Sequence, residues 1–94
     1  MLFLIYCTDK PDHENVRLEN RPAHLEYLDG FLDQVFTAGP TLSEDSESMT
    51  GSVLIMDFKD MAAAQDFAEN DPYNQAGLFE SVTIKPWKKV LPKD

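Results

Sequence analysis

Two histidines are present in this sequence of 94 residues, and His24 is the one whose neighbours favour chemistry. It follows Arg21-Pro22 and stands beside a run of apolar residues, where an imidazole can lie at the edge of a core. Because histidine gains and loses a proton near neutral pH, His24 is a candidate general acid or base. The alternative is a histidine that only donates to a backbone carbonyl at the edge of the core.

Asp71 is the residue that could orient His24. An Asp-Pro pair at the end of a helix is often only a turn. If two helices pack on one face of a sheet, however, the Asp71 end of the second approaches His24 on the first. A carboxylate there would hold one tautomer of the imidazole and leave its other nitrogen free.

Arg17 and Arg21 are the only arginines, and both flank the expected start of the first helix. In an acidic chain, either guanidinium could hold an anionic or enolate-like oxygen of a substrate. The alternative role for both arginines is salt bridging at the flank of the helix.

Several other kinds of site are not expected. The sequence has no Gly-rich phosphate loop, no Cys-x-x-Cys and no His-Glu-x-x-His, so neither a metal nor an organic cofactor is predicted. Cys7 lies in an apolar run and is expected to be a buried thiol. Two pairs of carboxylates, Asp9 with Asp12 and Glu44 with Asp45, stand in polar segments and are expected to be solvated.

The formal net charge of −9 disfavours nucleic acid and anionic membranes as partners. The lysines near the end of the chain are interpreted as the solvated flank of a strand. No run approaches the ~20 apolar residues of a membrane helix. The first residues lack the basic segment of a signal peptide, so a cytoplasmic location is expected.

Periodicity and turn signals predict a chain of alternating strands and helices. Asn20 is the expected cap of the first helix, with Pro22 in its first turn. The predicted elements are a strand over 2–8, a loop with room for an early helical turn over 9–19, a helix over 21–38, a strand over 40–42, an exposed loop or hairpin turn over 43–50, a strand over 51–58, a helix over 60–70, a turn or one short helical turn over 74–77 and a strand over 79–90.

Apolar residues at spacings of three and four mark the faces that the two helices should turn toward the core. Asp71-Pro72 should end the second helix. The expected buried stripe of the first helix is Leu25, Leu28, Leu32, Val35 and Phe36. The expected buried face of the second is Met61, Ala64, Phe67 and Ala68.

The order β-α-β-β-α-β predicts an α+β fold of the ferredoxin-like type, with two helices on one face of a four-stranded antiparallel sheet. Residues 1–94 should form a single domain. The first and third strands are apolar at both alternating positions, whereas two helices cover only one face. We therefore expect a second copy to cover the other face, giving a homodimer.

Several segments, taken together, resemble the YciI (YCII-related) family. They are Arg21-Pro22-Ala23-His24-Leu25, Thr37-Ala38-Gly39-Pro40, Thr50-Gly51-Ser52, Asp71-Pro72-Tyr73 with Ala76-Gly77, and Ser81 through Lys89. The resemblance implies a dimeric α/β barrel with a pocket centred on a histidine and an aspartate, here His24 and Asp71. It also implies that Gly39, Pro40, Gly51 and Ser52 surround that pocket and that Tyr73 contributes to substrate binding.

Some members of the family act as dehydrochlorinases on hydroxylated, chlorinated aromatic rings, and similar folds host muconolactone isomerases. The resemblance therefore implies proton transfer on a small cyclic or enolisable molecule, as in a lyase or an isomerase. In this hypothesis His24 moves the proton, Asp71 orients His24, and Arg17 or Arg21 holds the oxygen of the substrate. The alternative is a module that binds a small molecule, or has a structural role, without turnover.

Overall fold

The elements of the computed structural model follow the expected order, and the structure describes residues 1–93. They are β1 (Leu2–Asp9), α1 (Glu14–Asp29), a 3-10 turn (Leu32–Gln34), β2 (Val35–Leu42), β3 (Met49–Asp57), α2 (Met61–Glu69), the short helix α3 (Pro72–Gln75) and β4 (Phe79–Trp87). No helix within residues 1–93 is long and apolar enough to cross a membrane.

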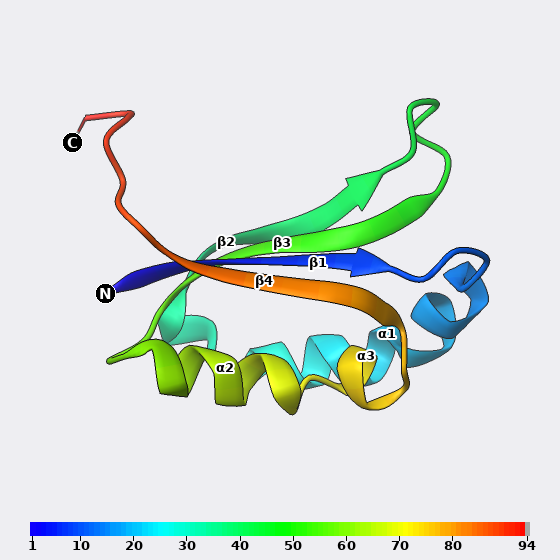
Figure 1. The fold of residues 1–94 in the computed structure, drawn as a ribbon, viewed down its shortest axis with the longest axis horizontal. Helices are drawn as coiled ribbons and strands as arrows, with labels where there is room; N and C mark the ends of the chain where they lie inside the picture. Colours follow the sequence, from blue (N-terminus) through cyan, green and yellow to red (C-terminus); the bar gives the residue numbers. More distant parts are fainter. Residues whose placement is uncertain (94) are drawn as a thin grey trace.

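The strands form one antiparallel sheet in the order β2-β3-β1-β4. Figure 1 shows all helices on one face of this sheet, while no helix or strand within residues 1–93 covers the other face. This arrangement is the predicted ferredoxin-like fold. Since β1 and β3 occupy the centre, their apolar side chains point alternately into the helix layer and onto the open face.

The core lies between the sheet and the helices. Phe3, Ile5 and Cys7 on β1 alternate into it, and the burial of Cys7 agrees with the prediction. Asp60 caps α2 by accepting from the backbone N–H of Ala63 at 2.8 Å. The predicted inner face of α2 is confirmed, because Ala64, Phe67 and Ala68 are buried and Met61 packs against the core.

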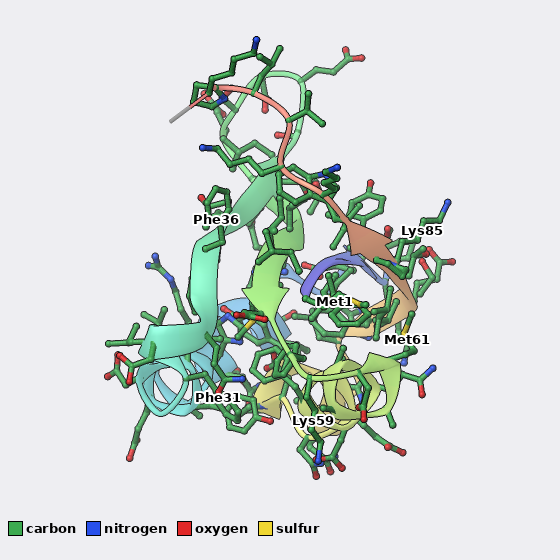
Figure 2. The ribbon with its side chains drawn as sticks, turned by 90° about the vertical axis from the view of Figure 1, so that its left-hand side faces the viewer. Met1, Phe31, Phe36, Lys59, Met61 and Lys85 are labelled. Carbon is green, nitrogen blue, oxygen red and sulfur yellow. The ribbon has the colours of Figure 1, made fainter. Side chains whose placement is uncertain are left out.

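The centre of the open face of the sheet is apolar, and two aromatic side chains from the edge strands meet over it. Phe36 on β2 and Trp87 on β4 have ring centroids 6.0 Å apart. These strands are the two edges of the sheet, and three flat interstrand spacings would separate them by about 14 Å. Figure 2 places Phe36 on the side of the sheet opposite Phe31 and Met61, which lie with the helices. The two large side chains therefore extend toward each other across the open face.

The first helix differs from the prediction in both of its ends. It begins at Glu14 with His13 as its cap, so Pro22 lies in its interior and Asn20 is not a cap. The predicted loop over 9–19 is therefore wrong in its second half. The inward residue of this added part is a buried arginine, Arg17, and not an apolar residue that periodicity could reveal.

The predicted stripe of that helix was also wrong in part. The helix ends at Asp29, and Val35 and Phe36 belong to β2, which is longer than predicted. Leu25 and Leu32 are 46% and 61% exposed. The side chains of α1 and the following segment that pack on the core are Tyr27, Leu28 and Phe31. The last strand ends at Trp87 rather than at residue 90.

Candidate functional site

One face of α1 carries the polar side chains of the candidate site. Arg17, Arg21, His24 and Leu28 recur at spacings of four, three and four, which places them along one side of the helix. This side faces the inner surface of β2 and β3. The corrected start of α1 therefore brings Arg17 into the same row as His24.

His24 and Asp71 are in contact. The Nδ1–H group of His24 donates to Oδ1 of Asp71 at 2.9 Å, and both side chains are buried. The same oxygen accepts from the backbone N–H of Tyr73 at 2.9 Å, since Asp71 caps α3. The carboxylate is thus fixed by a helix end, and it selects the tautomer of His24 that leaves Nε2 unprotonated.

Tyr73 supports the imidazole from the side. Its ring stacks on that of His24 with centroids 4.0 Å apart and planes inclined by 15°. The guanidinium of Arg17 lies over the same ring at 4.6 Å from its centroid. Burial raises the pKa of Tyr73, although the nearby charges of Arg17 and Arg21 act in the opposite direction. Tyr73 therefore holds His24 in place as an uncharged aromatic surface at neutral pH.

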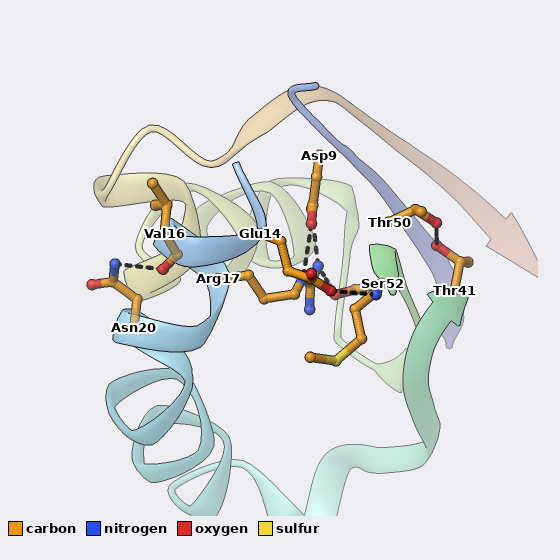
Figure 3. Close-up of polar contacts among 9 residues, drawn as sticks. Asp9, Glu14, Val16, Arg17, Asn20, Thr41, Thr50 and Ser52 are labelled. Carbon is orange, nitrogen blue, oxygen red and sulfur yellow. Dashed lines mark hydrogen bonds and ion pairs between the residues drawn. The ribbon is translucent and has the colours of Figure 1, made fainter. Parts of the chain in front are cut away.

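Arg17 is held by two polar partners, as Figure 3 shows. Its Nε and Nη2 atoms donate to the two oxygens of Asp9 at 2.7 and 2.9 Å, and Nη2 also donates to Ser52 Oγ at 2.9 Å. Burial disfavours the charge of Arg17, but the hydrogen bonds and charge of Asp9 outweigh it and raise the Arg17 pKa.

The expectation that Asp9 is solvated was wrong. Its side chain is only 5% exposed. Asp9 continues the inward alternation of Phe3, Ile5 and Cys7 along β1, so it points into the layer where Arg17 lies. The parity of the strand was the signal that could have revealed this pair.

A cavity of about 200 Å³ lies beside these groups, between α1 and the inner side of β2 and β3. Its polar wall contains Arg21, His24, Ser52 and Tyr73, with Arg17 behind them. Its remaining wall is apolar and includes residues that the sequence did not single out for a site. These are Leu25, Leu28, Ala38, Met49 and Leu54, together with the predicted Gly39 and Pro40.

Two groups of this cavity have no protein partner among residues 1–93. Nε2 of His24 makes no hydrogen bond there, and no fully buried side-chain nitrogen or oxygen lacks a partner. Nε2 therefore remains accessible from the cavity. Arg21 is exposed, lines the cavity and forms no ion pair with any described residue. Arg21 is thus the arginine available to an anion, whereas Arg17 is committed to Asp9.

The two glycines of the predicted pocket have different roles. A Cβ on Gly51 would lie 2.2 Å from the carbonyl oxygen of Cys7, so this strand position requires glycine. A Cβ on Gly39 would meet no atom within 4 Å. Gly39 lines the cavity, whereas Gly51 lets β1 and β3 approach next to Ser52.

No group of three or more His, Cys, Asp or Glu side chains within residues 1–93 could hold a metal ion. The cavity brings together a base, His24, a cation, Arg21, and the hydroxyl groups of Ser52 and Tyr73 around an apolar space.

Comparison with known proteins places the chain in a family. A model described as the YCII-related domain matches residues 1–88. Protein YciI of Escherichia coli O6:H1 is 44% identical over 98 aligned residues, which cover 97% of this chain and 100% of YciI. The chain belongs to the YCII-related family. An uncharacterized protein of Haemophilus influenzae is 37% identical over the same shares of the two chains.

One solved structure of an enzyme resembles this chain throughout. It is the 5-chloro-2-hydroxyhydroquinone dehydrochlorinase TftG of Burkholderia phenoliruptrix, in complex with 2,5-dihydroxybenzoquinone. Its sequence is 42% identical to this chain, its TM-score is 0.87, and the match covers 94% of each chain. The fold of this YCII-related chain is therefore also the fold of an enzyme that acts on a small hydroxylated ring.

Proposed function

We propose that this chain is an acid/base enzyme that moves a proton on a small cyclic, enolisable molecule, as a dehydrochlorinase or an isomerase does. The observation that carries the proposal is the orientation of His24. Its Nδ1–H is held by buried Asp71, and Nε2 remains accessible from a cavity between α1 and the sheet. A base held in one tautomer, next to a ligand-sized space, is the arrangement that general base catalysis requires.

The walls of the cavity limit the substrate. About 200 Å³ is less than the ~300–1,000 Å³ of pockets for drug-sized ligands, so a single ring fits best. Apolar side chains cover its faces, while Arg21 offers a positive charge at the rim. This combination favours a planar ring that carries an ionisable hydroxyl or a carboxylate.

The proposed reaction needs no oxidant. His24 Nε2 takes a proton from a carbon or hydroxyl of the ring, and the freed electron pair moves toward a ring oxygen beside Arg21. In a dehydrochlorinase reaction, the electron pair returns from that oxygen into the ring and forms a double bond to the carbon that carries chlorine, and chloride leaves with the electrons of the carbon–chlorine bond. In an isomerase reaction, the proton returns to another carbon. The likeness to TftG favours the first outcome, and the reaction type is what the experiment decides.

The test uses chlorinated hydroxyhydroquinones as substrates, with chloride release and ring absorbance as readouts. We expect turnover by the natural chain and none by His24→Asn. Tight binding of 2,5-dihydroxybenzoquinone without turnover of any ring would instead favour a binding module. A His24→Asn protein with full activity would exclude the proposed base.

We also propose that a second copy of the chain covers the open face of the sheet. Leu4 and Tyr6 alternate along β1 with residues buried against the helices, and they pair with Ile55 and Val53 on β3, so these four side chains lie on the open face. No element within residues 1–93 covers them, and a second copy of the same sheet offers a matching apolar surface. Exposed apolar patches of this kind mark interaction surfaces.

A further inference from the structure

The side-chain hydrogen bond of Ser52 indicates a role that differs from those of His24 and Arg21. Ser52 lies on the inner side of β3, is only 5% exposed, and lines the cavity. Its single described side-chain hydrogen bond comes from Nη2 of Arg17 at 2.9 Å. A guanidinium has no acceptor, so Ser52 Oγ is the acceptor in this contact.

The proton of the Ser52 hydroxyl therefore has no partner among residues 1–93. Both oxygens of Asp9, the nearest carboxylate of the network, already accept from Arg17. A hydroxyl that accepts one hydrogen bond can still donate one, and cooperativity strengthens a donor whose oxygen already accepts from a cation. Since the cavity lies beside Ser52, a bound molecule is the available acceptor.

The same contact excludes a nucleophilic serine. A serine nucleophile needs a base that removes its proton. The polar partner of Ser52 is an arginine whose pKa is raised, so it takes no proton. What the network can do is hold the hydroxyl in one orientation.

We propose that Ser52 is a further catalytic residue, whose hydroxyl donates a hydrogen bond to an oxygen of the bound ring. This inference rests on the proposed function. As His24 Nε2 takes the proton, the electron pair moves to the ring oxygen, and the Ser52 hydroxyl stabilises its negative charge. Arg17 and Asp9 act through Ser52 and are positioning residues. The arrangement corresponds to one donor of an oxyanion hole.

The test uses 2,5-dihydroxybenzoquinone as the probe, with calorimetric titration of the natural chain, Ser52→Ala, Ser52→Thr and the control Ser81→Ala. Ser81 is an exposed serine on β4. A hydrogen bond to a charged group corresponds to a change in affinity of about 10- to 100-fold. We expect that loss in Ser52→Ala, partial or full recovery in Ser52→Thr, and no change in Ser81→Ala.

A second readout separates donation from a structural role. A hydroxyquinone changes its visible absorption when it ionises, and a donor to its oxygen favours the anion. The bound probe should therefore ionise at a higher pH in Ser52→Ala than in the natural chain. If Ser52→Ala does not fold, Ser52→Cys, a weaker donor, should shift ionisation in the same direction.

Equal affinity and equal ionisation of the probe in the natural chain and in Ser52→Ala would overturn the role of Ser52. If His24→Asn were still inactive in that case, the proposed base would stand. A natural chain that neither binds the probe nor turns over a related ring would overturn the proposed function and the role of Ser52 together.

Discussion

Nδ1 of His24 lies 2.9 Å from Oδ1 of Asp71, although 47 residues separate them in the sequence. The contact joins the middle of α1 to the cap of α3 and leaves Nε2 accessible from the cavity. A carboxylate that accepts from both an imidazole and a backbone N–H is held rigidly. The two nitrogens of His24 therefore have separate roles, because Nδ1 contacts Asp71 and Nε2 is accessible from the cavity. Substitutions can test each role.

His24→Asn should lower the turnover of any substrate by about 10²- to 10⁴-fold, the usual contribution of a general acid or base. The amide nitrogen of asparagine can still donate to Asp71, whereas nothing replaces Nε2. The melting temperature should therefore change little. Steady-state kinetics and thermal unfolding of the same preparation check both parts. An active His24→Asn protein, or one that unfolds at room temperature, would contradict this assignment.

The two arginines should respond differently to truncation. Arg21→Ala removes an exposed cation, so stability should change by no more than about 0.5 kcal/mol. The affinity for an anionic ring should fall about tenfold or more. Arg17→Ala leaves Asp9 buried without its partner, which costs about 3–5 kcal/mol. Urea unfolding and ligand titration separate these effects. The reverse ranking of stabilities would show that Arg17 is not the structural member of the pair.

Cys7 should be unreactive in the folded protein. Burial, with smaller contributions from nearby charges, raises its pKa from 9.0 to about 12. A disulfide reagent at pH 8 should therefore modify Cys7 only after urea is added. Rapid modification without denaturant would contradict the burial of this thiol.

Because the pKa of Cys7 is raised in the folded protein, the free energy of unfolding should change with pH in the alkaline range. The folded state retains the Cys7 proton where the unfolded chain releases it, so its contribution is complete below pH ~9 and declines as the pH rises toward about 12. The raised pKa values of Tyr27 and Tyr73 act in the same direction. Urea unfolding at increasing pH should show a falling free energy, and Cys7→Ser should reduce the slope.

The open face of the sheet should determine the oligomeric state. Sedimentation at micromolar concentration should give about twice the chain mass of 10.7 kDa. Ile55→Lys places a charge on the open face and should yield the monomer. Glu26→Lys, on the exposed side of α1, serves as the matched control and should remain a dimer. A natural chain that sediments as a monomer would contradict the proposed interface.

The two glycines of β2 and β3 provide a matched pair for backbone packing. Gly51→Ala forces a Cβ against the carbonyl oxygen of Cys7, and overpacking of this kind costs about 1–3 kcal/mol. Gly39→Ala meets open space and should change stability by no more than about 0.5 kcal/mol. Urea unfolding of both variants is the measurement. Equal losses would mean that β1 and β3 do not approach closely at Gly51.

Local patterns in the sequence were sufficient for the order of the elements, the sheet with helices on one face, and the inner face of α2. They also placed Asp71 at a helix end near His24. These features depend on short-range properties, such as alternation in strands, a 3.6-residue period in helices and the effect of proline on the residue before it.

The tertiary structure decided the start of α1, the burial of Asp9 and the different roles of the two arginines. Arg17 binds Asp9, whereas Arg21 lines the cavity without an ion pair among residues 1–93. Each of these features depends on a charge whose burial is favourable only because an opposite charge lies beside it in space. Asp9 and Arg17 are both polar, so the pattern predicted a loop where Asp9 ends β1 and Arg17 lies in the first half of α1. The stacking of Tyr73 on His24 likewise arises only once α3 packs against α1, because no local rule relates residues so distant in the chain.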